Sequence, residues 1–138
     1  IQAAVLNAKL PLLDSYSAAR QNAARKYTAI LQGHKNIIAP SICDVCDCHV
    51  FHQYTLRIID ADRDGLMQHL LDKGIPCAIY YPIPLHAQKA YLDARYKEED
   101  FPITNQLVKE VISLPMHTEL DDEQIQFITS SILEFLDK

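Results

Sequence analysis

The chain has 138 residues, of which 49% are hydrophobic and 22% are charged, and its formal net charge is −5. This length allows one domain with one core, and the composition is typical of an ordered chain rather than a disordered one. The negative charge argues against a general nucleic-acid or anionic-membrane surface, because both need a basic face. No apolar run approaches the length that spans a bilayer.

Two helices are predicted at the start of the chain. Residues 1–10 already follow a helical pattern, which we expect to break or kink at Pro11, because proline lacks a backbone N–H. A longer helix is predicted from about Asp14 to about Leu31, with Asp14 as its N-cap and Gly33 as a left-handed C-cap. A helical pattern that starts abruptly, without a cap, suggests that the chain was cut from a longer protein.

Three cysteines lie close together in a predicted loop over residues 34–48. Thiolates at the spacing of Cys43, Cys46 and Cys48 can bind zinc or an iron–sulfur cluster, with a following histidine as the fourth ligand. No second pair of closely spaced cysteines occurs, and no secretory signal is seen. We therefore favour reduced, free thiols in a cytoplasmic protein over a metal site or a disulfide framework.

A strand, a helix and a second strand are predicted next. The strand covers residues 49–59, which are rich in β-branched and aromatic residues. The helix is capped by Asp60 or Asp62 and is closed by Gly74. The second strand covers residues 75–79. This order predicts a βαβ or split-βαβ unit with the helix on one face of the sheet.

The remainder of the chain is predicted to contain an irregular stretch, two helices and a short strand. Residues 85–101 are irregular, a helix follows Pro102, and residues 112–115 form an edge strand. The last helix begins at Asp121, with Gln124 in position for a capping box. We therefore predict a single α+β domain with two layers, in which a sheet of about three strands packs against helices mainly on one side.

The stretch from residue 74 to residue 88 carries the candidate functional residues. Prolines end the preceding strand and leave a stiff loop with the side chains of Tyr80, Tyr81 and His86. His86 and His117 have no nearby nucleophile, and no glycine-rich phosphate loop is present. The residues alone therefore predict an α+β domain without a self-contained active site.

Several stretches form an ordered set that extends over nearly the whole chain. They include Arg20-Gln-Asn-Ala-Ala-Arg-Lys-Tyr27, His49-Val-Phe-His-Gln-Tyr54, Gly74-Ile-Pro76, Tyr81-Pro-Ile-Pro-Leu-His-Ala-Gln88 and Ile112-Ser-Leu-Pro-Met-His117. Together they resemble the C-terminal small domain of the DegT/DnrJ/StrS family of sugar-nucleotide aminotransferases. Each stretch alone is a weak signal, but the ordered set is specific.

The resemblance implies an aspartate-aminotransferase fold type, pyridoxal phosphate (PLP) as cofactor, and amino transfer from glutamate to a keto-sugar nucleotide. It implies that the PLP-binding lysine belongs to a large domain before residue 1. Residues 1–138 would then be a C-terminal small domain that is inactive alone and neither binds PLP covalently nor holds a metal. The full-length protein would be a homodimer.

The resemblance also assigns substrate-binding residues. A His-Tyr pair that reaches towards the sugar nucleotide in the family corresponds here to Tyr80 and Tyr81, and His86 follows them as a substrate-binding or loop-anchoring residue. Tyr80 departs from the usual histidine; it still donates a hydrogen bond but is not a cation at neutral pH. The pattern is most similar to members that act on UDP-linked 3-keto N-acetylated sugars in surface-polysaccharide synthesis.

Two other classes of protein remain open at this point. One is a free-standing ligand-binding or regulatory α+β domain without catalysis. The other is a small metal-binding module built on the cysteine cluster.

Overall fold

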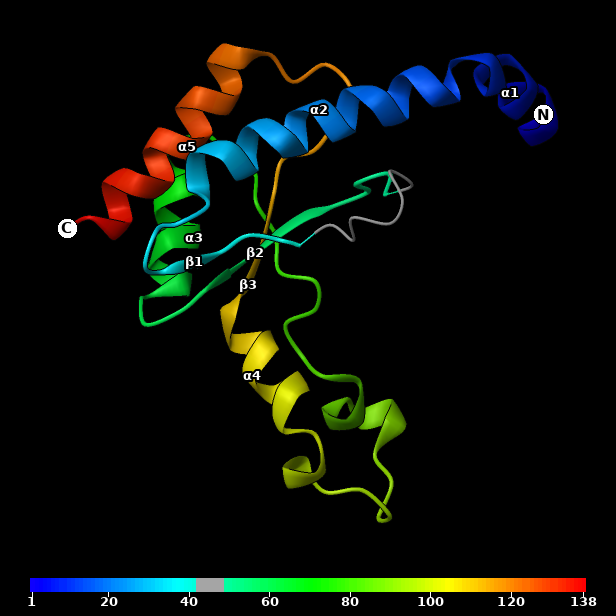
Figure 1. Cartoon of the computed structure of the whole chain (residues 1–138). Helices are drawn as coiled ribbons and strands as arrows, with labels where there is room; N and C mark the ends of the chain where they lie inside the picture. Colours follow the sequence, from blue (N-terminus) through cyan, green and yellow to red (C-terminus); the bar gives the residue numbers. More distant parts are fainter. Residues whose placement is uncertain (42–48) are drawn as a thin grey trace.

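The computed structural model describes residues 1–41 and 49–138, and the cysteine cluster at 43–48 lies outside this part of the chain. The elements are arranged in the order shown in Figure 1. They are α1 (Gln2–Lys9), η1 (Leu10–Leu12), α2 (Leu13–Leu31), β1 (Ile37–Ile38), β2 (Tyr54–Ile58), α3 (Arg63–Asp72), η2 (Leu85–Ala87), η3 (Lys89–Tyr91), η4 (Glu98–Asp100), α4 (Pro102–Glu110), β3 (Val111–Leu114) and α5 (Asp122–Leu136), where η denotes a 3-10 turn.

The N-terminal helices follow the prediction except at one cap. The turn η1 contains Pro11 and separates α1 from α2, so the predicted break at this proline is confirmed. The N-cap of α2 is Leu12, and the predicted capping role of Asp14 is therefore wrong. Asp14 lies in the first turn, where the helix dipole favours a carboxylate. Gly33 has φ +93°, which confirms the left-handed end of the helix.

The sheet has the order β1-β2-β3, and both strand pairs are antiparallel. β2 and β3 align Tyr54 with Leu114. On the other edge of β3, Ala78 and Ser113 exchange two backbone hydrogen bonds, of 3.1 and 2.8 Å. The run that contains Ala78 is therefore parallel to β2 with β3 between them, which is the split-βαβ arrangement, one of the two expected.

The strands differ from the prediction in their extent. The strand expected over residues 49–59 shortens to β2, because Phe51 has φ +45° and donates its N–H to the Nδ1 atom of His49 at 3.0 Å. This local turn replaces the ladder at the beginning of the predicted strand. β1 lies within residues 34–48, which were expected to be a loop, and its two residues are too few to show an alternating pattern.

Helix α3 has the predicted ends, but the run after it is not a full strand. The carboxylate of Asp62 accepts the N–H of Gly65 at 2.9 Å, and Gly74 has φ +74°, so both predicted caps are confirmed. The strand expected at residues 75–79 makes only one bridge to β3. Its Pro76 has no N–H to donate to a ladder.

The C-terminal third agrees closely with the sequence analysis. Helix α4 begins at Pro102, and the irregular stretch expected over residues 85–101 contains the short turns η2 to η4. The strand expected at residues 112–115 is β3, which begins and ends one residue earlier than predicted. The Asp121 carboxylate accepts the Gln124 N–H at 2.7 Å, and the Gln124 side chain accepts the Asp121 N–H at 3.1 Å, so the capping box is confirmed.

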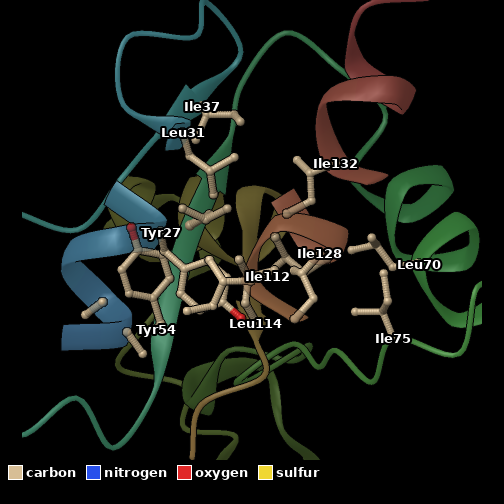
Figure 2. Close-up of a cluster of buried hydrophobic side chains, with 14 of the residues drawn as sticks. Tyr27, Leu31, Ile37, Tyr54, Leu70, Ile75, Ile112, Leu114, Ile128 and Ile132 are labelled. Atoms are coloured by element: carbon tan, nitrogen blue, oxygen red, sulfur yellow. The ribbon is translucent and has the colours of Figure 1, made fainter. Parts of the chain in front are cut away.

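Helices α2, α3 and α5 form the core with one face of the sheet, and Figure 2 shows their side chains meeting there. Alternate residues of β2, namely Tyr54, Leu56 and Ile58, are buried in this core. Between them, Arg57 points to the opposite face, where it pairs with Glu110 of α4 at 2.8 Å. The predicted α+β class is confirmed.

Two buried tyrosines connect α2 to the sheet. The rings of Tyr27 and Tyr54 lie 5.0 Å apart, and both side chains are fully buried. The Tyr27 hydroxyl donates to the Pro115 carbonyl at 3.1 Å, and the Tyr54 hydroxyl lies 2.7 Å from the Thr28 hydroxyl. Burial raises the pKa of both phenols above the usual range, and the neighbouring Tyr54 adds to the effect on Tyr27.

Two parts of the chain project from the core. Helix α1 has no buried residue, and Figure 1 shows it extending beyond the sheet together with the start of α2. The second part, which we call the extension (residues 81–110), runs from the end of the run after α3 to the end of α4 (Figure 1). Within residues 1–41 and 49–138, no helix combines the length with the apolar character that crossing a membrane requires.

Replacing Tyr27 with phenylalanine should change how stability depends on alkaline pH. In the unfolded chain a tyrosine ionises near pH 10, whereas the folded Tyr27 phenol stays protonated because burial raises its pKa. The unfolded state therefore gains from ionisation as the pH rises, by about 1.4 kcal/mol at about pH 11 for each such phenol. We expect Tyr27→Phe to be about 1 kcal/mol less stable near pH 7, because its hydrogen bond is lost, but to lose less stability between about pH 9 and about pH 11.

Urea unfolding followed by circular dichroism at these pH values measures the effect. Tyr96→Phe is the matched control, because the Tyr96 ring is exposed on the extension. If wild type and Tyr27→Phe lost the same amount of folding stability between about pH 9 and about pH 11, the burial argument would be contradicted.

Candidate functional site

A short run after α3 carries the chain to the candidate site. Gly74 ends the helix, and Ile75 is buried in the core, which holds the start of the run. Ala78 is held by its backbone bonds to β3. Tyr80 and Tyr81 follow at the point where the run leaves the sheet. The core therefore determines where the two predicted substrate-binding tyrosines lie.

A cavity of about 340 Å³ lies beside Tyr80, where the chain enters β2 and leaves β3. Its polar side chains come from three separate segments of the chain: His52, Gln53, Tyr80, Ser113 and His117. Prolines, Leu114 and Met116 are among its apolar residues. A pocket of a few hundred Å³ with an apolar lining and several converging polar groups is the usual form of a small-molecule site.

The two histidines of the cavity differ in their hydrogen bonding. The Nδ1 atom of His117 accepts the backbone N–H of Glu119 at 3.2 Å, so the ring is neutral in this arrangement and its proton is on Nε2. His52 is exposed and makes no hydrogen bond within the described chain. These rings and the Tyr80 hydroxyl are suited to hydroxyl and carbonyl oxygens of a ligand.

Cys77 lines the cavity, but its environment does not favour a nucleophilic thiolate. Burial raises the pKa of the Cys77 thiol, so the reactive thiolate is disfavoured. Its Sγ atom lies 3.8 Å from the Met67 carbonyl and donates to it. Cys77 therefore contributes packing to the wall of the cavity.

The structure separates the three residues that the sequence analysis grouped together. Tyr80 lines the cavity and has 48% of its surface exposed. Tyr81 is 72% exposed and touches the Tyr80 ring edge-on, with ring centroids 5.9 Å apart. His86 lies in η2 of the extension, does not line the cavity, and stacks on Phe101 at 4.3 Å between centroids. The geometry of His86 is that of an anchor for the extension.

The sequence does not reveal that His52, Gln53 and His117 share one cavity. In the sequence His117 is only a lone histidine after a proline. The alignment of Tyr54 with Leu114 in the antiparallel pair brings the residues just before β2 next to those just after β3. This pairing was the signal that could have found the cavity, and it is visible only once the two strands are known to be partners.

PLP, which the sequence resemblance implies, needs a lysine amine and a site for its phosphate. Among the described residues, the cavity lining contains neither lysine nor arginine. Lys26 and Lys73 pair with Asp122 and Glu134, and neither lysine lines the cavity. The residues around the cavity do not fit this cofactor by themselves. Within the described ranges, no three His, Cys, Asp or Glu side chains gather in a way that could hold a metal ion.

Comparison with known proteins gives one consistent family. The model of the DegT/DnrJ/EryC1/StrS aminotransferase family matches residues 1–133. A "Pleiotropic regulatory protein" of Geobacillus stearothermophilus is 39% identical over 137 residues, which are 98% of this chain and 36% of that protein. The UDP-N-acetyl-3-dehydro-alpha-D-glucosamine 3-aminotransferase of Acidithiobacillus ferrooxidans is 37% identical over 132 residues, covering 96% of this chain and 34% of that protein.

A solved structure is similar over the whole fold. The crystal structure of DesV from S. venezuelae, in complex with a ketimine intermediate, superimposes with a TM-score of 0.91 at 31% identity. The match covers 99% of this chain and 36% of that chain. The chain thus spans about a third of the length of the curated relatives that it matches.

Removing the ring of Phe101 should loosen the extension without unfolding the core. Phe101→Ala removes the stack with His86 and the contact with Tyr96, whose ring centroid lies 5.8 Å away. Aromatic pairs contribute about 0.5–1.5 kcal/mol, so we expect cleavage by trypsin at Lys89 and Arg95 to become about threefold to tenfold faster.

Limited proteolysis followed by mass spectrometry measures the cleavage sites and rates. Tyr91→Ala is the control, because Tyr91 is exposed on the same extension and makes no ring contact within the described chain. Equal cleavage of wild type and Phe101→Ala would show that the stack does not hold the extension.

Proposed function

Because this chain belongs to the DegT/DnrJ/EryC1/StrS aminotransferase family, we propose that it is one domain of an enzyme that aminates a keto-sugar nucleotide. In the proposed reaction the amino group of glutamate replaces the keto oxygen of the sugar, and 2-oxoglutarate and an amino-sugar nucleotide are formed. The observation that carries the proposal is the family match over residues 1–133. The cavity lined by Tyr80 supports it.

We propose that these residues act within a longer polypeptide as its small domain. The relatives are about three times as long as the chain, and α1 carries exposed apolar side chains with none buried. Apolar surface of this kind usually marks an interface with another domain or subunit. In this proposal the full-length protein is a cytoplasmic enzyme that forms a homodimer. Residues 1–138 alone do not transaminate.

PLP is the proposed cofactor of the full-length enzyme. It supplies an electron sink for amino transfer when bound. The related DesV structure contains a ketimine intermediate, which supports a cofactor of this type. Since the described cavity does not fit the cofactor by itself, the lysine and the phosphate-binding groups would be supplied by other residues of the full-length protein.

Tyr80 and Tyr81 are the proposed contacts to the sugar nucleotide. Tyr80 lines the cavity, and Tyr81 presents an exposed phenol beside it. His86 contributes indirectly, because its stack on Phe101 holds the loop that follows the two tyrosines. A UDP-linked 3-keto N-acetylated sugar is the proposed substrate, as for the relative from Acidithiobacillus ferrooxidans, and surface-polysaccharide synthesis is the proposed role.

A regulatory or ligand-binding domain without catalysis is the second candidate. It is favoured by one observation, the name "Pleiotropic regulatory protein" of a relative that is 39% identical. Such a protein would use the same cavity to bind a ligand and would not consume glutamate.

The full-length protein with PLP distinguishes the two candidates. We expect a change in cofactor absorbance when glutamate is added, and an amino-sugar nucleotide detected by mass spectrometry when the UDP-linked 3-keto N-acetylated sugar follows. Tyr80→Phe removes one neutral hydrogen bond, so the KM for the sugar nucleotide should rise about threefold to tenfold.

Tyr96→Phe serves as the control, because this exposed tyrosine does not line the cavity. If wild-type protein binds the sugar nucleotide but leaves glutamate unchanged, the aminotransferase proposal fails and the regulatory one stands.

A further inference from the structure

The lining of the cavity beside Tyr80 combines polar and apolar residues. The apolar ones include Pro76 and Ala78 from the run after α3, and Leu114 and Met116 around the end of β3. His52, Gln53, Tyr80 and His117 bring polar groups from three segments that are far apart in the sequence. A hexose ring has the matching pattern, because it carries hydroxyl and carbonyl oxygens around a C–H framework.

His117 is the polar residue whose hydrogen-bonding state the structure defines. Its Nδ1 atom is occupied by the Glu119 N–H at 3.2 Å, so Nε2 carries the proton and is left to donate. Pro115, two residues earlier, is held by the hydroxyl of Tyr27 at 3.1 Å. The backbone on both sides of His117 is therefore fixed by hydrogen bonds, which orients the donor before a ligand arrives.

The cavity is poorly suited to the diphosphate of a nucleotide sugar. Two phosphate charges call for lysine, arginine or a helix N-terminus. The described lining has no lysine, arginine, aspartate or glutamate, and the sequence of residues 42–48 contains no basic residue. The uncharged donors of Gln53, Tyr80 and His117 match an uncharged ligand better.

We propose that this cavity receives the sugar ring of the nucleotide sugar, and that His117 binds a sugar oxygen through its Nε2–H. The inference rests on the proposed aminotransferase function and assigns one residue beyond the tyrosines. In this arrangement the C–H framework of the ring contacts the apolar lining residues, and its oxygens face the polar ones. The diphosphate and the nucleoside extend out of the cavity to other parts of the full-length protein.

The full-length protein with PLP tests the assignment through two variants. His117→Phe keeps an aromatic ring but removes the donor, and His117→Gln restores an amide donor. For His117→Phe we expect the KM for the UDP-linked 3-keto N-acetylated sugar to rise about threefold to tenfold, with partial recovery in His117→Gln. The glutamate half-reaction and inhibition by UDP should stay within about twofold of wild type, because neither uses the sugar ring.

His34→Phe is the matched control, because His34 does not line the cavity and pairs with Asp137 at 3.2 Å. It lies two residues before Asn36, whose side chain bonds to the backbone at the other end of β2. Thermal unfolding confirms that each variant is folded. A parallel loss of UDP inhibition in His117→Phe would place the nucleotide in the cavity and overturn the proposal. An unchanged KM would overturn it as well, and so would equal losses in both half-reactions, which indicate a structural role. If wild type fails the glutamate half-reaction, the proposed function itself is wrong.

Discussion

The burial of Tyr27 against Tyr54 is the contact on which the other features depend. It brings α2 onto the sheet, and the two rings fill the space between helix and strand at 5.0 Å. A buried hydroxyl must be hydrogen-bonded, and the Tyr27 hydroxyl is satisfied by the carbonyl of Pro115. The same bond therefore holds the chain where it leaves β3. A packing contact in the core thus determines the geometry of a wall of the cavity.

The cavity follows from strand pairing rather than from any single motif. β3 is paired with β2 on one edge and with Ala78 on the other, so three segments end at the same place. His52, Gln53, Tyr80 and His117 lie just outside these paired residues, and Ser113 contributes from within β3. The polar groups of the site therefore gather at one end of the sheet.

The projecting parts of the chain connect the fold to the proposed function. The core under α2, α3 and α5 is complete, because their inner faces are buried. Helix α1 and the extension, by contrast, expose apolar side chains, among them Leu6, Tyr81 and Ile103. The proposed role, a small domain that contributes one wall of an active site, needs both properties. In that role the core would position the wall, and the uncovered apolar faces would meet the rest of the enzyme.

Features that depend on neighbouring residues can be predicted from the amino-acid sequence. The break at Pro11, the capping box of Asp121 with Gln124 and the left-handed glycines are all local, and all were predicted correctly. The ordered motifs also indicated the family. The extent of the strands and the location of the cavity, in contrast, depend on long-range contacts in the folded chain. A local turn at Phe51 competes with the ladder there, and His52 meets His117 only through antiparallel pairing between residues far apart in the chain. Such contacts depend on which segments pack together, and periodicity within one segment carries no information about its partner.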